Sequence, residues 1–374
     1  MVRLQLKKND IIPKYYQLKE QVRRRIEKGV LKPGDSLPSE PQIVDKLGLS
    51  RNTIRQAMAE LEQEGFIVRE QGRGTFVARA ERPAGRKKIV AGTGVGIAFF
   101  KTGQMKHPYM SRLFHSIGAC ATDYRFHTQL FVAKGEHFGS VRSLLRQAIL
   151  SQRINGLLLV EEGEKENLDF LVEIGFPFVV VNMEFMTHRE LPTVKVDSYR
   201  ATLLGLEHLL RLGHRRIGLL CGPFSYPGSG QRFASHEILQ AYKDCLEQFG
   251  IPFDPQLVQE TSYLLQEGRD FTRQLLQLPS RPTALLTTDD ILAFGAKLAV
   301  AEKHLRIPGD VSIVALGDLL GMADLTVVQY PFDEMAGKAV RMLSCLLEGT
   351  PIHCLKENIN GRLIVRGSTT AYKP

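Results

Sequence analysis

Apolar residues recur at helical spacing in the first eighty residues. In "SRNTIRQAMAELEQEGFIV", Ile54, Met58 and Leu61 follow one another at i, i+4 and i+7. This spacing predicts one buried face of a helix that ends near Gly65. The same periodicity predicts an earlier amphipathic helix over residues 14–28.

The residues between these two helices predict a third, shorter helix. Ser39, with Gln42 three positions later, matches a capping box, and we expect this helix to end near Leu47 and Gly48. The next helix follows after almost no connection, which is helix-turn-helix geometry. The sequence "FIVREQGRGTFVAR" then predicts two short strands around a glycine-rich turn. Such a hairpin would form a wing beside the helices.

The pattern changes after Val95. Short apolar runs such as "VGIAFF", "NGLLLV" and "VSIVALGD" alternate with amphipathic stretches up to the end of the chain. This alternation predicts doubly wound parallel sheets, and the length suits two lobes with a ligand-binding crevice at the carboxyl ends of their strands. The predicted fold class is thus multi-domain, an N-terminal winged helix-turn-helix followed by a two-lobed α/β domain. We divide the chain into a winged helix-turn-helix over 1–80, a linker over 81–94 and a two-lobed domain over 95–374, with lobe 1 at about 95–196 and 318–340 and lobe 2 at about 197–317 and 341–374.

Charge separates the first of these parts from the rest. Residues 1–88 hold 20 Lys and Arg against 11 Asp and Glu, so they carry the whole formal excess of +9. The remaining residues carry 29 of each sign. A basic module joined to a larger neutral one is typical of a nucleic-acid binder with a second function, although attachment to a ribosome or a membrane surface would give the same sum.

Two arginines on the predicted helix suggest how such a module reads DNA. Arg51 and Arg55 lie four residues apart, opposite the apolar stripe and near the positive end of the helix, where Ser50 stands as N-cap. An ordinary solvated surface is the plain alternative, because charged outward faces are common. In the wing, Gly72 permits a tight turn, and Arg73 supplies charge that a narrow minor groove attracts.

Residues 11–78 resemble the GntR family of winged-helix transcription factors. The resemblance is carried by "KPGDSLPSE", "SRNTIRQAMAELEQEGFIV" and "GRGTFV". It implies a double-stranded DNA operator as partner. This chain departs from the family at Pro41, where the pattern has an arginine, so one expected DNA contact is missing. By this resemblance the DNA-binding residues are Arg51 and Arg55 in the major groove, Ser50 and Thr53 on the DNA backbone, and Gly72 and Arg73 at the minor groove.

The rest of the chain, from about 95 to 370, resembles the effector domain of LacI/GalR-type repressors, which is related to periplasmic sugar-binding proteins. The clearest segments are "VDSYRATLLGLEHLLRLGHRRIGLLCGP" and "SRPTALLTTDDILAFGAKLAVAEKHLRIPGDVSIVALGD". Together with the head, the chain is similar to the arabinose-repressor type of regulator. The resemblance implies a homodimer with a small-molecule effector, expected to be a carbohydrate or a similar metabolite.

A polyhydroxylated effector needs a carboxylate for paired hydroxyls, an aromatic face and orienting amides. By position in the family pattern we select Asp290, Asn182, Tyr109 and Tyr263. Each has a structural alternative: Asp290 as a helix N-cap, Asn182 as the end of a strand, and the tyrosines as packing at the edge of a lobe.

Two positions depart from the LacI/GalR pattern. The family has an arginine where this chain has Ile238, and Arg232 is the candidate to replace it if its loop folds inward. Asp318 stands alone where the family tends to have paired acids. These departures leave the class of ligand open.

The remaining chemistry is sparse. The five cysteines show no C-x-x-C pair and no histidine at zinc-ligand spacing, so we expect reduced thiols, a cytoplasmic protein, no metal and no cofactor. No apolar run reaches the roughly 18 residues of a membrane span, and no export signal is expected.

The predicted function is therefore a ligand-controlled DNA-binding regulator, expected to be a repressor, with no catalytic residues. The alternative is an enzyme fused to a DNA-binding head. An aminotransferase-like body would need a Schiff-base lysine beside an acid, and neither Lys297 nor Lys303 has such a setting in the sequence.

Overall fold

The computed structural model covers residues 1–374, and the statements below concern the part of the chain that it describes. The described residues are 14–27, 30–32, 34–63, 66–70, 73–77, 93–99, 108–132, 146–149, 151, 153–160, 165–185, 190–224, 231–232, 234–352 and 354–373. Most of the predicted linker and most of a helix predicted over 139–151 lie outside them.

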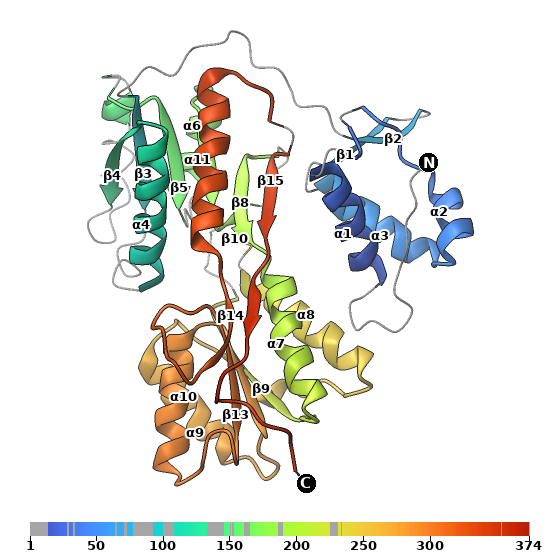
Figure 1. The fold of residues 1–374 in the computed structure, drawn as a ribbon, viewed down its shortest axis with the longest axis vertical. Coiled ribbons are helices and arrows are strands. Elements are labelled where there is room, and N and C mark those ends of the chain that lie inside the picture. The colour runs from blue at the N-terminus through green and yellow to red at the C-terminus, as the bar shows by residue number, and fades with distance from the viewer. Residues whose placement is uncertain are drawn as a thin grey trace.

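The N-terminal part, which we call the head, is three helices followed by a two-stranded wing (Figure 1). The wing strands pair antiparallel, with Ile67 opposite Val77. The apolar stripes predicted from the sequence meet in one core, where Leu18, Ile54 and Leu61 are fully buried. The elements are α1 (Lys14–Glu27), α2 (Glu40–Leu47), α3 (Arg51–Gln63), β1 (Ile67–Glu70) and β2 (Gly74–Val77).

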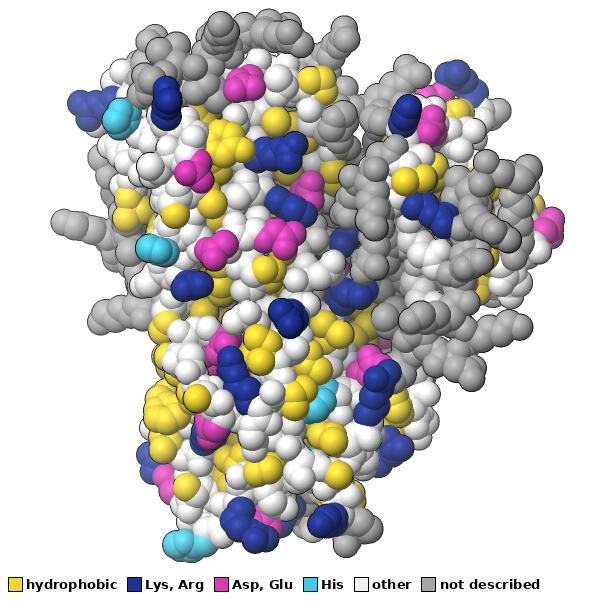
Figure 2. All heavy atoms as spheres, in the orientation of Figure 1, with side chains coloured by type: hydrophobic (Ala, Val, Ile, Leu, Met, Phe, Trp, Pro, Cys, Tyr) yellow, Lys and Arg dark blue, Asp and Glu magenta, His cyan; other side chains and the backbone are white. Residues whose placement is uncertain are grey.

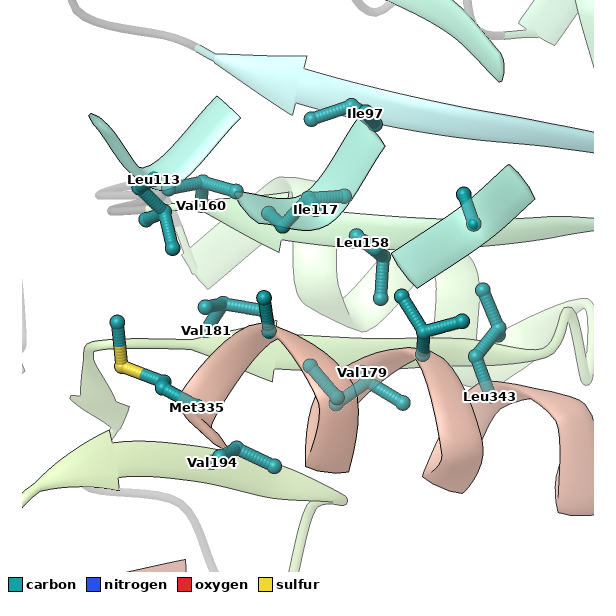
Figure 3. Close-up of a cluster of buried hydrophobic side chains, with 14 of the residues drawn as sticks. Ile97, Leu113, Ile117, Leu158, Val160, Val179, Val181, Val194, Met335 and Leu343 are labelled. Carbon is teal, nitrogen blue, oxygen red and sulfur yellow. The ribbon is translucent and has the colours of Figure 1, made fainter. Parts of the chain in front are cut away.

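Lobe 1 of the body is built on a six-stranded parallel sheet in the order β15-β8-β6-β5-β3-β4. Helices α4 and α11 pack together on one face of this sheet (Figure 3). Side chains from both helices interleave there with valines and leucines of the strands. The elements of this lobe are β3 (Gly94–Phe99), α4 (Pro108–Asp123), β4 (His127–Val132), β5 (Gly156–Val160), α6 (Lys165–Glu173), β6 (Phe178–Val181), β8 (Thr193–Val196), α11 (Phe332–Glu348) and β15 (Lys356–Ile359).

Lobe 2 is a second six-stranded sheet in the order β11-β9-β12-β13-β14-β16. Its strands are parallel except β16, which runs antiparallel to β14. The strands β9, β12 and β13 are buried along their whole length, which explains why the sequence shows continuous apolar runs here and no alternation. The elements are α7 (Ser198–Arg211), β9 (Ile217–Cys221), α8 (Ala234–Gln248), η2 (Pro255–Leu257), β11 (Val258–Glu260), α9 (Leu265–Leu276), β12 (Ala284–Thr287), α10 (Asp290–Glu302), β13 (Ser312–Leu316), β14 (Thr326–Gln329) and β16 (Arg362–Ile364).

The chain passes between the two sheets three times, from β8 to α7, from β14 to α11 and from β15 to β16. Each passage leaves a strand at its carboxyl end and takes only one or two residues. The carboxyl ends of both sheets therefore face each other at these crossovers. A second link is the antiparallel pair of β7 (Glu184–Phe185) and β10 (Gln231–Arg232), which joins a loop of lobe 1 to a loop of lobe 2.

The predicted fold class is confirmed, but the predicted division between the lobes is wrong near the C-terminus. We expected 318–340 in lobe 1, yet β14 pairs with β13 in the sheet of lobe 2. We also expected 341–374 in lobe 2, yet β15 pairs with β8 in lobe 1. The sequence pattern identifies a strand but carries no information about which of two similar sheets it joins.

Candidate functional site

The turn between α2 and α3 is fixed by local hydrogen bonds. The capping box is present, because the Ser39 amide donates to Gln42 Oε1 (2.9 Å) and the Gln42 amide donates to Ser39 Oγ (3.5 Å). Gly48 ends α2 with a φ of 63°, a conformation that glycine adopts without steric cost. Only three residues thus separate the end of α2 from the start of α3.

Ser50 and Thr53 interact with each other at the start of α3. The Thr53 amide donates to Ser50 Oγ (3.1 Å), and the two hydroxyl oxygens are 2.8 Å apart. Ser50 therefore acts as the predicted cap. Both hydroxyls lie at the end of the helix where the positive pole of the macrodipole favours an anion.

The exposed face of α3 carries the two predicted arginines. Arg51 is exposed and forms no ion pair with a residue that the structure describes. Arg55 Nε lies 3.8 Å from Glu40 Oε2 and its side chain is 63% exposed, so this contact is a weak surface pair. Asn52 and Gln56 are exposed on the same face. These amides were not predicted from the sequence, although each directly follows one of the arginines and the two are four residues apart.

The wing projects one arginine. Arg73 is 75% exposed and its guanidinium pairs with Glu70 at 2.5 Å, while Gly74 has a φ of 121°. The predicted contact Gly72 lies outside the described residues. Sequence analysis also missed Arg69, which lies 3.4 Å from Glu40 and 3.2 Å from Glu62 and so joins the wing to α2 and α3.

In lobe 2, Asp290 is the most informative of the predicted effector residues. It begins α10 at the carboxyl end of β12 and is completely buried. The Leu320 amide donates to its Oδ2 (2.6 Å), whereas its Oδ1 is buried without a hydrogen-bond partner among the described residues. The N-cap role belongs to Asp289, whose Oδ1 accepts from the Leu292 amide (2.7 Å). Burial raises the pKa of the Asp290 carboxyl above its usual value.

Thr288 supplies a second buried oxygen atom that lacks a hydrogen-bond partner among the described residues. It lies between β12 and α10 with 6% of its surface exposed, and its Oγ1 has no hydrogen-bond partner in the described part of the chain. A hydroxyl and a carboxylate oxygen left unsatisfied two residues apart suit a ligand with hydroxyl groups. Thr288 was not predicted from the sequence, where its place in "TTDD" was the signal that pointed to it.

Tyr263 lies beside this position in lobe 2. Its hydroxyl sits so close to Gly222, directly after β9, that a Cβ on this glycine would lie 2.0 Å from the hydroxyl oxygen. Tyr263 also has a φ of 62°, an uncommon backbone conformation for a residue with a side chain. Since β9 and β12 are neighbours in the sheet, the structure brings Tyr263 and Asp290 to the same edge.

The two predicted residues of lobe 1 lie at the opposing edge. Tyr109 is in the first turn of α4, and its ring packs edge-on against Phe332 with centroids 5.1 Å apart. Asn182 follows β6 with a φ of 58°, and its Oδ1 accepts a hydrogen bond from the Val196 amide (3.4 Å). The side chain of Asn182 thus also supports the strand that leads into the first crossover.

The departures from the family pattern have structural explanations. Ile238 is buried in the core of lobe 2, so an arginine is not accommodated there without rearrangement. The backbone of Arg232 pairs with Glu184 of β7, which places the residue at the link between the lobes. Asp318 forms an ion pair with Arg366 inside lobe 2, with Arg366 Nη2 2.6 Å from Asp318 Oδ2.

The surface charge of the body agrees with its balanced composition. On the face drawn in Figure 2, lysines and arginines of the two lobes are interspersed with acidic side chains and form no single patch. Among the described residues, no helix has the length and apolar character that a membrane crossing requires.

A small helix-turn-helix head with a basic wing, followed by two parallel α/β lobes joined by three crossovers, is an architecture of two modules. Comparison with known proteins agrees with both. Residues 14–77 match the family of bacterial regulatory proteins of the gntR type, and residues 206–369 match the periplasmic binding protein-like domain. The chain is therefore a GntR-type helix-turn-helix module joined to a periplasmic-binding-protein-like domain.

Individual relatives combine or share these modules. The chain is 28% identical to the arabinose metabolism transcriptional repressor of Geobacillus stearothermophilus, over 97% of this chain and 99% of that protein. It is 29% identical to the HTH-type transcriptional repressor CytR of Escherichia coli K12, over 71% of this chain and 76% of that protein. A LacI-family regulatory protein from Chloroflexus aggregans shares the fold of the body, with a TM-score of 0.65, 24% identity and coverage of 75% and 99%.

Proposed function

We propose that this protein is a transcription regulator, a repressor, whose binding to an operator in double-stranded DNA is controlled by a small hydroxylated effector held between the lobes. The observation that carries the proposal is that two sets of polar side chains lack full pairing within the described residues. One is the exposed cationic face of α3, and the other is the pair of buried oxygen atoms at Thr288 and Asp290.

The head supplies the DNA contacts in this proposal. Arg51 and Arg55 reach the major groove, Ser50 and Thr53 contact phosphates at the start of α3, and Arg73 enters the minor groove. Arginine in two parallel hydrogen bonds recognises guanine, and amides such as Asn52 and Gln56 recognise adenine. Phosphate contacts fix the register of the helix, whereas base contacts select the sequence.

The effector in this proposal is a sugar or a similar polyol. Asp290 Oδ1 accepts one of its hydroxyl groups and Thr288 a second, while Tyr263 presents an apolar ring face. Tyr109 and Asn182 contact the ligand from the opposing edge, and Arg232 contacts it from the link between the lobes. A partly satisfied buried carboxylate costs stability, and a ligand hydroxyl removes that cost by supplying the missing hydrogen bond.

We infer that the protein acts in the cytoplasm as a homodimer, because two heads are needed to read two half-sites. Two apolar side chains, Phe294 and Leu298, stand one turn apart on α10 with 39% and 37% of their surfaces exposed. Leu264, just before the adjacent α9, is 57% exposed. An apolar patch of this kind favours burial against a second copy.

An enzymatic body has less support. Lys297 pairs with Asp324 (Nζ to Oδ2 2.6 Å) on the outside of lobe 2, and Lys303 ends α10. Neither lysine is placed as a Schiff-base residue beside the carboxyl edge of the sheet. The named relatives are transcriptional repressors.

The test has two steps. Pentoses, hexoses, their phosphates and nucleosides are first screened for a rise in melting temperature of the full chain, because a ligand that binds the native state stabilises it. The affinity for a duplex selected from a random-sequence library is then measured with and without the stabilising compound. The proposal requires a compound that both stabilises the protein and changes the DNA affinity. A protein that selects no sequence would contradict it.

A further inference from the structure

The head rests against both lobes of the body. Tyr15 of α1 packs against the apolar core of lobe 2. Cys354, just before β15 of lobe 1, is buried among the core residues of the head. Figure 1 shows the head on the side of the body where β15 and α7 lie. The head is thus in contact with both lobes at once.

The contact with lobe 2 includes a chain of hydrogen bonds. The hydroxyls of Tyr15 and Tyr199 are hydrogen-bonded, and the Tyr199 hydroxyl donates to Asp244 Oδ2 (2.6 Å). Gln240 Nε2 donates to the other oxygen of this carboxylate (2.6 Å). A phenol has one proton to donate, so Tyr15 donates to Tyr199 while Tyr199 donates to Asp244. The chain therefore runs from α1 of the head through α7 to α8.

One head contact lies next to a crossover, and the other lies beyond the opposite end of β15. Tyr199 is in the first turn of α7, two residues after Asp197, the residue between β8 and α7. Cys354 precedes β15, whose last residue Ile359 accepts a hydrogen bond from the Asp197 amide (2.8 Å). A rotation of one lobe against the other about this point moves Tyr199 relative to Cys354. A rigid head cannot keep both contacts after such a rotation.

Docking leaves the DNA-reading face open. Arg51 and Arg55 are exposed in the docked head, and so is Arg73 of the wing. The docked position therefore does not block DNA sterically. What docking restricts is the position of the head relative to the body.

We propose that the docked head is the operator-binding state and that a change in the angle between the lobes releases it through loss of the Tyr15–Tyr199 contact. This inference rests on the proposed function and specifies its regulation. In a dimer, docked heads have a fixed spacing, so the second head meets its half-site at a high effective concentration. Released heads no longer have a fixed spacing, and this advantage falls. An effector thus lowers operator affinity without touching the head.

The test removes hydroxyl groups from the full-length protein and uses two DNA probes. One probe is a palindromic duplex selected from a random library with the wild-type protein, and the other has one half-site scrambled. Tyr199→Phe keeps the ring and removes the link. A hydrogen bond contributes about 1 kcal/mol net, so we expect roughly fivefold weaker binding to the palindrome. Binding to the single half-site stays unchanged, because the head itself is intact.

Tyr242→Phe is the matched control. It also removes a buried hydroxyl of lobe 2, but Tyr242 donates to the Ile217 carbonyl inside the lobe (2.7 Å). Both probes should bind this variant as they bind the wild type. Tyr15→Phe should reproduce the effect of Tyr199→Phe, and the double variant should lose no more than either single variant. Equal losses on both probes, or no loss on the palindrome, would overturn the inference.

Hydrogen exchange separates this inference from the proposed function. Without DNA, the amides of α1 should exchange faster in Tyr199→Phe than in the wild type or Tyr242→Phe, because the docked head protects them. A wild-type protein that selects no DNA sequence would contradict the proposed function. Unchanged exchange in α1 would contradict docking alone, whatever the DNA result.

Discussion

At the residue scale, two groups of side chains lack strong partners among the described residues. The arginines of α3 keep their charge exposed instead of entering strong ion pairs within the head. Asp290 is the opposite case, because its carboxylate is buried and only half satisfied. Groups of both kinds lower stability or contribute little to it, so their positions are best explained by binding.

Arg51→Ala and Arg55→Ala should each weaken binding to the selected operator by about 1–3 kcal/mol where the arginine contacts a base. The cause is the loss of a charged bidentate donor. Fluorescence anisotropy with labelled duplex measures the change. Arg112→Ala, which removes an exposed arginine from α4 of the body, is the control and should bind DNA normally. Wild-type affinity in both α3 variants would exclude this helix as the reader.

Asp290→Asn should abolish the thermal shift caused by the effector while leaving DNA binding intact. Burial raises the pKa of the Asp290 carboxyl above its unfolded value, so the folded state binds this proton more tightly. Its contribution to stability is therefore greatest in acid and is lost as pH rises through the folded pKa. Above that pH the carboxyl no longer contributes, and we expect the variant without ligand to melt at the same or a higher temperature at pH 7.

Melting curves of the wild type and Asp290→Asn at pH 5 and pH 7 test whether the Asp290 carboxyl stabilises the fold more in acid. Any advantage of the variant should be larger at pH 7 than at pH 5, because the raised pKa favours the protonated wild-type carboxyl in acid. A variant that melts lower than the wild type at pH 7 and still responds to the effector would show that Asp290 is purely structural.

At the element scale, the head was predictable because its signals are local. The capping box at Ser39, the glycine stop and the spacing of Ile54 and Leu61 each depend on residues a few positions apart. The assignment of β14 and β15 was not predictable in the same way. Which sheet a strand joins depends on packing across the crossovers. Tyr15 could not be predicted because its contacts are with residues distant in sequence, and Thr288 could not because its feature is a missing hydrogen bond.

Helices α9 and α10 show how close packing constrains one element against another. A Cβ on Gly295 of α10 would lie 2.3 Å from the Leu265 carbonyl oxygen and 2.7 Å from the Arg269 amide nitrogen. Because these are backbone atoms, no side chain can move aside. Gly118 in α4 has no atom within 4 Å of the same position.

Gly295→Ala should therefore destabilise the protein by about 1–3 kcal/mol, as expected for overpacking. Gly118→Ala is the matched substitution and should stabilise by about 0.5–1 kcal/mol, because alanine loses less backbone entropy in a helix. Chemical denaturation monitored by circular dichroism gives both values. Equal effects of the two substitutions would show that α9 and α10 are not packed this closely.

At the scale of the whole molecule, the net positive charge lies in the head, and the body is neutral. The first 88 residues carry the entire formal excess of +9, and the body carries none. The partners predicted for the two parts follow this division, a polyanion for the head and a neutral polyol for the body. The contacts at Tyr15 and Cys354 connect the head to the body, and the three crossovers connect the two lobes of the body.

DNA affinity should fall steeply with salt, since each neutralised phosphate releases counterions and contributes about −0.9 to the slope of log K against log salt concentration. Removing one arginine that contacts phosphate should reduce the slope by about 1. Effector affinity, measured by calorimetry in the same buffers, should be nearly independent of salt. A flat DNA response would contradict an electrostatic reader.

The most direct measurement of the central claim is a titration of the selected duplex with the full chain, with and without the compound that raises its melting temperature. The account predicts that saturating compound weakens operator binding at least tenfold, while binding of a single half-site is unchanged. Identical operator affinity with and without a compound that demonstrably binds the body would contradict the account.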